Sequence, residues 1–298
     1  MDQRVFTRAE LRDAGHTRAS IASRIASGEI VRARRDRYLD GGVAPELVEA
    51  VRVGGRLTCV SLLALHGVFV LESPGLHVHS GQHASRQRAR CSAEILPDTP
   101  ELLRAREVRR HWNPLIEPVD AATPHVGIVD ALVHAVRCQP PRAAVATLDS
   151  ALNKKLISLE QLDDVFAALS RKYRVLRPLV DGRAESGPET LMRLLLRALG
   201  CRVELQVRFA GIGRVDLLVD GWLVIECDSR SFHEGWAAQE KDRERDLALA
   251  ARGFTTLRPT ANAIMRRPGE VAAAVRGLLE ARSVVRGAER PVARHARP

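Results

Sequence analysis

The sequence predicts an α/β protein of more than one domain. Segments with helical periodicity and short segments with strand-like alternation follow one another along the chain. A length of 298 residues exceeds one typical domain, and the Asp181-Gly182-Arg183 break separates a mixed middle region from a compact C-terminal pattern. Apolar residues make up 45% of the chain and aromatic residues only 4%, so we expect cores built from Leu, Val and Ala.

Residues 1–42 predict two short helices followed by a basic ribbon. Thr7 can cap the first helix, with Glu10 at the spacing of a capping box. The second helix spans about 17–27, and Ile21 and Ile25 share one of its faces. Two helices joined by a short turn with glycine, then a ribbon, are typical of a winged helix-turn-helix domain.

In that layout the second helix enters the major groove of DNA and the ribbon reaches the phosphates. The expected DNA-binding residues are Arg18, Ser20 and Arg24 on the helix and Arg32, Arg34, Arg35 and Arg37 on the ribbon. The alternative is a small helical bundle whose arginines are only solvated.

Residues 43–180 predict a mixed α/β middle region, and no pattern in it indicates a role. The expected helices are 47–53, 59–66, 126–136, 143–152 and 158–169, and the expected strands are 76–79 and 106–111.

Residues 183–282 predict a compact unit in the order helix, three strands, helix, strand, helix. The helices are expected at 188–199, 235–252 and 268–281, and the strands at 203–209, 214–219, 222–227 and 254–258. The Asp220-Gly221 pair indicates a tight hairpin between the second and third strands. Residues 283–298 form a basic tail, which we expect to be disordered and to add non-specific phosphate affinity.

Carboxylates gather on this hairpin. Asp216 lies on one strand, and Glu226 and Asp228 follow the next. A two-residue turn would place Asp216 opposite Ile225 and beside Glu226, although a bulge would shift this register by one. Clustered carboxylates are typical ligands of hard divalent cations, so Asp216, Glu226 and Asp228 are expected to bind Mg²⁺ or Mn²⁺. The alternative is a solvated strand end that carries acids by chance.

Five further residues are candidates for catalysis or phosphate binding. Glu189 begins a helix, where it either caps the helix or points at the metal site. His233 follows the acidic strand and could carry a proton, although a single His is more often structural. Lys241 is the only Lys after residue 172 in a chain with 42 Arg and 4 Lys, so it could polarise water. Arg245 and Arg258 are expected phosphate clamps.

A second metal hypothesis uses histidines of the middle region. His77 and His79 alternate on an expected strand, and His83 follows. The pattern disfavours a zinc site, because no Cys or carboxylate lies beside these residues in sequence. The five cysteines are scattered without a CxxC pair, which argues against a disulfide framework.

The formal charge of +10 and a pI near 10.2 favour an anionic partner, with DNA ahead of a membrane. A GC-rich genome, which enriches Arg, is the alternative source of this charge. The chain shows no signal-peptide pattern and no apolar run of the length of a membrane span, so a cytoplasmic location is expected.

The stretch 188–258 resembles the PD-(D/E)XK nuclease superfamily, and most closely its branch related to very-short-patch-repair (Vsr-like) endonucleases. The resemblance rests on Glu189, Arg214-Val215-Asp216, Val224-Ile225-Glu226-Cys227-Asp228, His233, Asp242, Arg245-Asp246, Gly253 and Leu257-Arg258. It implies a restriction-endonuclease-like core in which Asp216 is the central metal ligand, Glu226 and Asp228 complete the site, Glu189 assists, and His233 is catalytic or faces DNA. The superfamily's Lys after the acidic pair is Asp228 here, so either Lys241 replaces it from the following helix or the site lacks that role and works weakly.

Residues 5–40 resemble, more loosely, the winged-helix region of AbiEi-type antitoxins, through Thr7, Leu11, Gly15, Ile21, Gly28, Ile30, Val31 and Tyr38. The expected function is a metal-dependent DNA endonuclease in repair or defence. The alternative is an antitoxin-like DNA-binding regulator with a non-catalytic nuclease-like domain, and a third option is a toxic RNase. A homodimer is an expected assembly, because cleavage of both DNA strands often needs two sites. The two resemblances also imply a toxin–antitoxin or repair partner.

Overall fold

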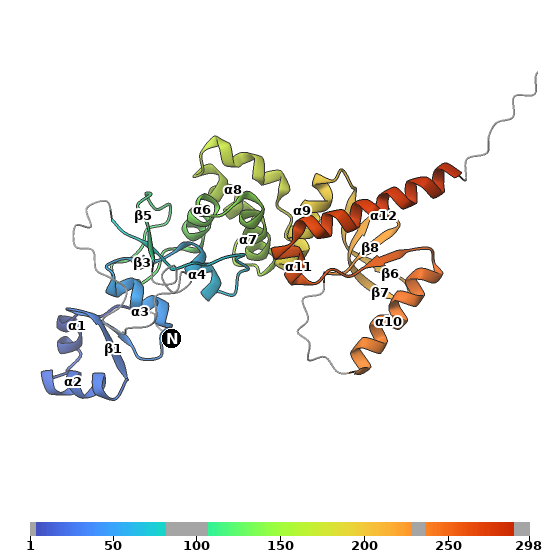
Figure 1. Cartoon of the computed structure of the whole chain (residues 1–298). Helices are drawn as coiled ribbons and strands as arrows, with labels where there is room; N and C mark the ends of the chain where they lie inside the picture. The colour runs from blue at the N-terminus through green and yellow to red at the C-terminus, as the bar shows by residue number, and fades with distance from the viewer. Residues whose placement is uncertain (1–3, 82–106, 228–235, 289–298) are drawn as a thin grey trace, which may run out of the picture. The chain divides into compact units, whose positions relative to one another are not determined.

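The structure is a computed structural model that describes residues 4–81, 107–227 and 236–288 (Figure 1). The chain forms two compact units, Met1–Gly182 and Arg183–Pro298. The predicted Asp181-Gly182-Arg183 break therefore coincides with the boundary between the units. The mixed α/β class is confirmed, because each unit contains both helices and small sheets.

The N-terminal elements occur in the predicted order. Helix α1 (Arg8–Asp13) begins at a Thr7–Glu10 capping box, and helix α2 (Arg18–Ala26) begins at Thr17. Strands β1 (Ile30–Arg34) and β2 (Arg37–Asp40) form an antiparallel hairpin. The buried side chains of Leu11, Ile21, Ile30 and Tyr38 hold the helices against this hairpin.

The hairpin also packs against helix α3 (Pro45–Arg52). Val5, Ala33 and Leu39 form one buried cluster with Val48 and Val51 of that helix. The tip of the hairpin is tied to α1, because the backbone N–H of Arg8 donates to Asp36 Oδ1 at 2.7 Å. Residue 42 is therefore not the end of the N-terminal packing, which continues through α3.

The rest of the first unit surrounds a three-stranded sheet in the order β3-β4-β5. Strand β3 (Arg56–Leu57) runs antiparallel to β4 (Leu76–His79), and β5 (Val108–His111) runs parallel to β4. The helical elements are α4 (Cys59–Leu65), α6 (Ile128–Cys138), α7 (Pro141–Asn153), α8 (Leu159–Ala167) and the 3₁₀ segment η1 (Arg171–Leu179). Sequence periodicity did not predict β3 or η1.

The second unit contains a four-stranded sheet in the order β6-β7-β8-β9 (Figure 1). Strands β6 (Val203–Phe209), β7 (Gly213–Val219) and β8 (Leu223–Ile225) are antiparallel neighbours, whereas β9 (Thr255–Leu257) runs parallel to β8. Helix α9 (Gly187–Ala198) precedes the sheet, α10 (Trp236–Ala251) connects β8 to β9, and α11 (Ala261–Arg266) and α12 (Pro268–Ala288) follow. The predicted order is present, with α11 as an additional helix.

Two local predictions for this unit are wrong. The Asp220-Gly221 turn closes as predicted, with Trp222 N–H donating to Val219 O at 3.1 Å, but Val219 then pairs with Leu223 and not with Trp222. Trp222 leaves the ladder, so every pairing on this hairpin is shifted by one residue. The tail also begins later than expected, because α12 continues to Ala288.

Within the described ranges, no helix is long and apolar enough to cross a membrane. Asp228, His233, His83, Cys91 and the end of the tail lie outside those ranges.

Candidate functional sites

One row across the sheet of the second unit contains four polar residues: Gln206, Asp216, Glu226 and, one residue beyond the Ile225–Leu257 pair, Arg258. The β6–β7 register pairs Leu205 with Leu217 and Val207 with Val215, which places Gln206 opposite Asp216. The β7–β8 register pairs Leu217 with Ile225, so Glu226 follows opposite Asp216. Residues opposite each other on adjacent strands point to the same face of a sheet. The one-residue shift thus brings Asp216 and Glu226 onto one face, which the predicted register would not have done.

The strand ladder is interrupted along this row. Gln206 has a left-handed backbone with φ of +57° and does not pair with Asp216. Strand β8 ends at Ile225, and the backbone N–H of Cys227 donates to Asp216 Oδ2 at 2.9 Å instead of to a neighbouring strand. A non-glycine residue with positive φ is uncommon in a strand and costs about 1–3 kcal/mol. Such strain clusters at functional sites, so the interrupted ladder makes this row a candidate functional site.

Glu226 is a buried carboxylate at the centre of the row. Its exposed fraction is 7%, and Arg245 Nη2 lies 2.8 Å from its Oε1. That guanidinium is not aligned for a hydrogen bond, so Oε1 has no hydrogen-bond partner among the described residues. Burial raises the pKa of Glu226, and the charge of Asp216 raises it further, while Arg245 and Arg258 act in the opposite direction. Burial and Asp216 therefore disfavour the charged form of Glu226, and the two arginines compensate for this only in part.

Glu189 lies in the first turn of α9, and its carboxylate accepts hydrogen bonds from neighbouring residues. Its Oε2 accepts hydrogen bonds from Gln206 Nε2 at 2.7 Å and from the backbone N–H of Glu185 at 2.9 Å. The N-cap of α9 is Ser186, whose hydroxyl accepts from the Glu189 N–H. Burial raises the pKa of Glu189. Glu189 thus satisfies one backbone donor just before the helix and also lines the pocket of the acidic row.

The acidic row opens into a pocket of about 380 Å³. Its lining combines carboxylates with three guanidinium groups, those of Arg214, Arg245 and Arg258. Arg258 makes a two-pronged ion pair with Asp246, and Arg245 also contacts the backbone oxygen of Arg214. The complete lining is Glu185, Ser186, Glu189, Arg214, Asp216, Glu226, Cys227, Asp242, Arg245 and Arg258.

The donor set of this pocket fits a hard divalent cation. Mg²⁺ is usually held by one or two carboxylates and keeps several of its waters, and Asp216 and Glu226 supply two carboxylates on one face. Lys241 is exposed and is not part of the lining, so the structure does not bring it to this site. Arg245, one helical turn later, lines the pocket instead.

The expected DNA-binding residues of the first unit divide into two groups. Arg18, Arg32 and Arg35 are exposed. Arg24, in contrast, donates to His16 Nε2 at 2.7 Å and pairs with Glu29 at 2.8 Å. Ser20, Arg34 and Arg37 also interact within the protein. The Ser20 hydroxyl donates to Thr17 O, and Arg37 pairs with Asp36. Arg34 also interacts with another group of the protein.

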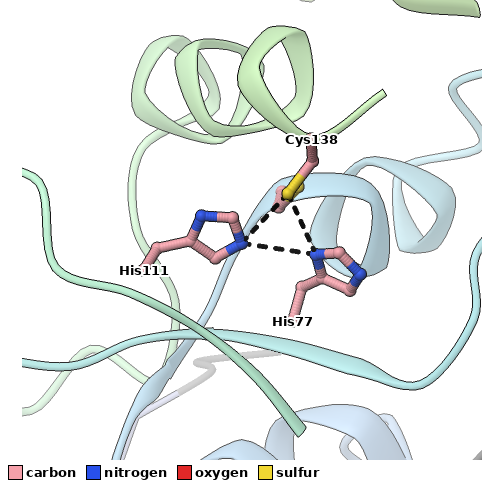
Figure 2. A group of neighbouring side chains, drawn as sticks. His77, His111 and Cys138 are labelled. Atoms are coloured by element: carbon pink, nitrogen blue, oxygen red, sulfur yellow. Dashed lines mark hydrogen bonds between the residues drawn. The ribbon is translucent and has the colours of Figure 1, made fainter. Parts of the chain in front are cut away.

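A second site, in the first unit, is a buried cluster of two cysteines and two histidines that could bind a metal ion. Its members are Cys59, His77, His111 and Cys138, whose ligand atoms all lie within 4.8 Å of one another. Figure 2 shows His77, His111 and Cys138 converging on one point. The hydrogen bond from Cys59, together with those from His111 and His77, lowers the pKa of the Cys138 thiol, whereas burial raises that of Cys59.

This cluster corrects the histidine hypothesis drawn from the sequence. His77 is a member, but His79 lies outside it, with Nε2 at 3.0 Å from Asn113 O. The cysteines that were missing beside the His-Val-His pattern come from other helices. The available signal was that Cys59 begins a predicted helix and His111 ends a predicted strand, but sequence spacing does not show which elements meet.

No model of a known protein family matches this chain. Two curated proteins from two strains of Mycobacterium tuberculosis, each described as an uncharacterized protein, are 33% identical to it over 146 residues. The match covers 45% of this chain and 54% of each relative, so the chain spans about half the length of the curated relatives it matches. Their descriptions name no activity.

Proposed function

We propose that the second unit is a divalent-metal-dependent DNA endonuclease of the PD-(D/E)XK, Vsr-like type, and that the first unit binds DNA through a winged helix-turn-helix. The observation that carries the proposal is the placement of Asp216 and Glu226 on one face of paired strands, inside a pocket that also holds Arg245 and Arg258. Carboxylates beside guanidinium groups can serve both a cation and a phosphodiester.

Each group has a distinct part in this proposal. Asp216 and Glu226 would hold Mg²⁺ or Mn²⁺, which would lower the pKa of a bound water and stabilise the charge of the attacked phosphodiester. Arg258 is held by Asp246 with its guanidinium at the pocket, which suits a phosphate clamp. Gln206 and Glu189 form a hydrogen-bonded pair that positions the acidic row. Asp228 and His233 remain predicted participants.

A second candidate is a DNA-binding regulator of the antitoxin type whose second unit does not catalyse. Two observations favour it. The superfamily's strand Lys is replaced by Asp228, and Arg245 lies 2.8 Å from Glu226, where it supplies positive charge without an ion. In this alternative the pocket is a phosphate-binding surface, and the interrupted row is what remains of a catalytic site.

The test is cleavage of plasmid, mismatched and branched DNA, and of single-stranded RNA, with Mn²⁺. We compare the wild type with Asp216→Asn, Glu226→Gln and the control Asp220→Asn. Asp220 is an exposed acid of the same hairpin whose carboxylate accepts from Arg202 N–H, a bond that Asn can keep. We expect losses of at least about a hundredfold for the first two, since an ion supplies several kcal/mol and each ~1.4 kcal/mol is tenfold, and wild-type rates for Asp220→Asn.

If no protein cleaves DNA and all bind it with the same salt dependence, the regulator replaces the nuclease. Cleavage of RNA alone would assign the third option, an RNase. Equal cleavage by the wild type and Asp216→Asn would refute the placement of the metal site.

A further inference from the structure

We infer that Cys59, His77, His111 and Cys138 form a structural Zn²⁺ site in the first unit, a site that is independent of the proposed nuclease. Two thiolates and two imidazoles are a common ligand set for zinc, and the two thiolates neutralise its charge. Cys59, His77 and His111 are buried, with exposed fractions of 0%, 2% and 7%. No carboxylate belongs to the cluster, so it does not have the ligand chemistry of a Mg²⁺ or Ca²⁺ site.

The distances agree with tetrahedral coordination. Bonds of about 2.0 Å to nitrogen and 2.3 Å to sulfur give tetrahedral edges of roughly 3.3 Å between nitrogens and 3.5 Å between nitrogen and sulfur. His77 Nδ1 and His111 Nε2 are 3.3 Å apart, and Cys138 Sγ lies 3.8 Å from His111 Nε2 and 4.0 Å from His77 Nδ1 (Figure 2). The sulfur needs to move inward by only a few tenths of an ångström.

The backbone at Cys59 supports a functional constraint. Cys59 is the first residue of α4, and its φ is +54°, a conformation that a residue with a side chain rarely adopts. The strained backbone directs a thiol into a buried polar cluster and not into the apolar core that surrounds it. A structural cysteine with no ligand role would avoid this conformation, which costs about 1–3 kcal/mol.

The site has a structural and not a catalytic character. All four tetrahedral positions are filled by protein side chains, which leaves no position for a substrate or water. The ligands come from the start of α4, from β4, from the end of β5 and from the end of α6. One ion would therefore join four elements of the first unit. A pocket of about 200 Å³ lined by His77 and Cys138 gives the ion a path from solvent.

The experiment measures metal in the full-length protein, purified under reducing conditions without chelator after growth with added zinc. Elemental analysis compares the wild type, Cys138→Ser and the control Cys201→Ser, which changes a buried free thiol of the second unit. We expect about one zinc per chain in the wild type and in the control. We expect Cys138→Ser to bind zinc more than about a hundredfold more weakly, because losing a ligand exceeds the ~10–100-fold effect of losing an outer partner.

Cobalt substitution keeps the test valid if Cys138→Ser does not fold. Wild-type protein loaded with Co²⁺ should show the visible bands of a tetrahedral site and a thiolate charge-transfer band. Asp216→Asn should retain the same zinc content, which separates this site from the acidic pocket. The inference would be overturned by a wild-type protein that holds no zinc and shows no such spectrum. Loss of zinc in Asp216→Asn would also overturn it. A third refuting result is a mass lower by two hydrogens, which would indicate a disulfide between Cys59 and Cys138.

Discussion

Asp216→Asn should stabilise the second unit in the absence of divalent ions. Asn can still accept the hydrogen bond from Cys227 N–H, but the variant removes one of two facing negative charges. A charged side chain that lowers the stability of the folded protein is typical of a binding site. The sign of this stability change is therefore more informative than its size.

The magnitude follows from the geometry of the row. Residues opposite each other on adjacent strands have Cβ atoms about 5 Å apart, and two unit charges at that separation repel by up to about 3 kcal/mol at an effective dielectric constant of ~20. The neutral amide accepts a weaker hydrogen bond than the carboxylate, which costs about 1 kcal/mol. Asp216 is also half-exposed, and Arg245 and Arg258 offset part of the repulsion. We expect a net gain of about 1 kcal/mol at pH 7.

The pH dependence gives an independent check. Burial and Asp216 raise the pKa of Glu226 in the folded protein above its value in the unfolded chain. The folded state therefore binds a proton more readily, so its stability rises as the pH falls through the raised pKa and is lost as the pH rises. With Glu226 neutral, Asp216 has no partner to repel. The advantage of Asp216→Asn should accordingly fade as the pH falls through the raised pKa of Glu226, which lies above the ordinary value of a Glu.

The assay is urea unfolding with EDTA at pH 7 and at acidic pH, followed by tryptophan fluorescence. Trp222 is buried in the second unit, and a Trp112→Phe background removes the exposed indole of the first unit. Asp220→Asn is the control, with an expected change within about 0.5 kcal/mol. Destabilisation of Asp216→Asn by more than about 2 kcal/mol at pH 7 would refute the reasoning, because the carboxylate would then be a structural acceptor.

Three further predictions concern single contacts. Gln206→Ala removes the side-chain donor to Glu189 and should lower the free energy of unfolding by about 2 kcal/mol, whereas Gln206→Gly should recover part of this loss by relieving the positive φ, as measured by urea unfolding. Asp36→Ala should lower the free energy of unfolding by about 1–2 kcal/mol, because it removes the acceptor at the start of α1 and places Ala at φ of +59°. A smaller loss of stability for Asp36→Ala than for Asp36→Gly would contradict this. Replacing both exposed arginines of the hairpin, Arg32 and Arg35, by Gln should reduce the slope of log affinity for duplex DNA against log salt by about 1.8, and an unchanged slope in a fluorescence anisotropy titration would remove the hairpin from the DNA contact.

The fold of the second unit was largely predictable from local chemistry. Helix α9 has an apolar stripe and a proline at its start, and Asp220 and Gly221 adopt the positive φ values that a tight turn requires. The register was not predictable. Trp222 leaves the ladder and packs with its ring under the guanidinium of Arg282 on α12, and this contact between distant parts of the chain has no signature in a strand's alternation.

The two sites differ in how visible they are in the sequence. Asp216 and Glu226 lie on neighbouring strands of one hairpin, so short-range spacing was sufficient to predict that they are close, whereas their common face depends on the register that spacing did not give. Gln206 was missed because nothing in its strand segment indicates a left-handed backbone. The Cys/His cluster was missed because its four residues come from four elements whose ends meet only in the folded unit.

The row across the sheet also has a consequence for the order of assembly. Gln206, Asp216 and Glu226 lie on a continuous antiparallel meander, but Arg258 arrives only when β9 pairs in parallel with β8 after the α10 crossover. Parallel pairing across a crossover is a late, long-range event in folding. Until it occurs, the two facing carboxylates lack one of their compensating cations, so docking of the last strand relieves electrostatic repulsion as well as burying apolar surface. We therefore expect completion of the pocket and completion of the sheet to be one cooperative step.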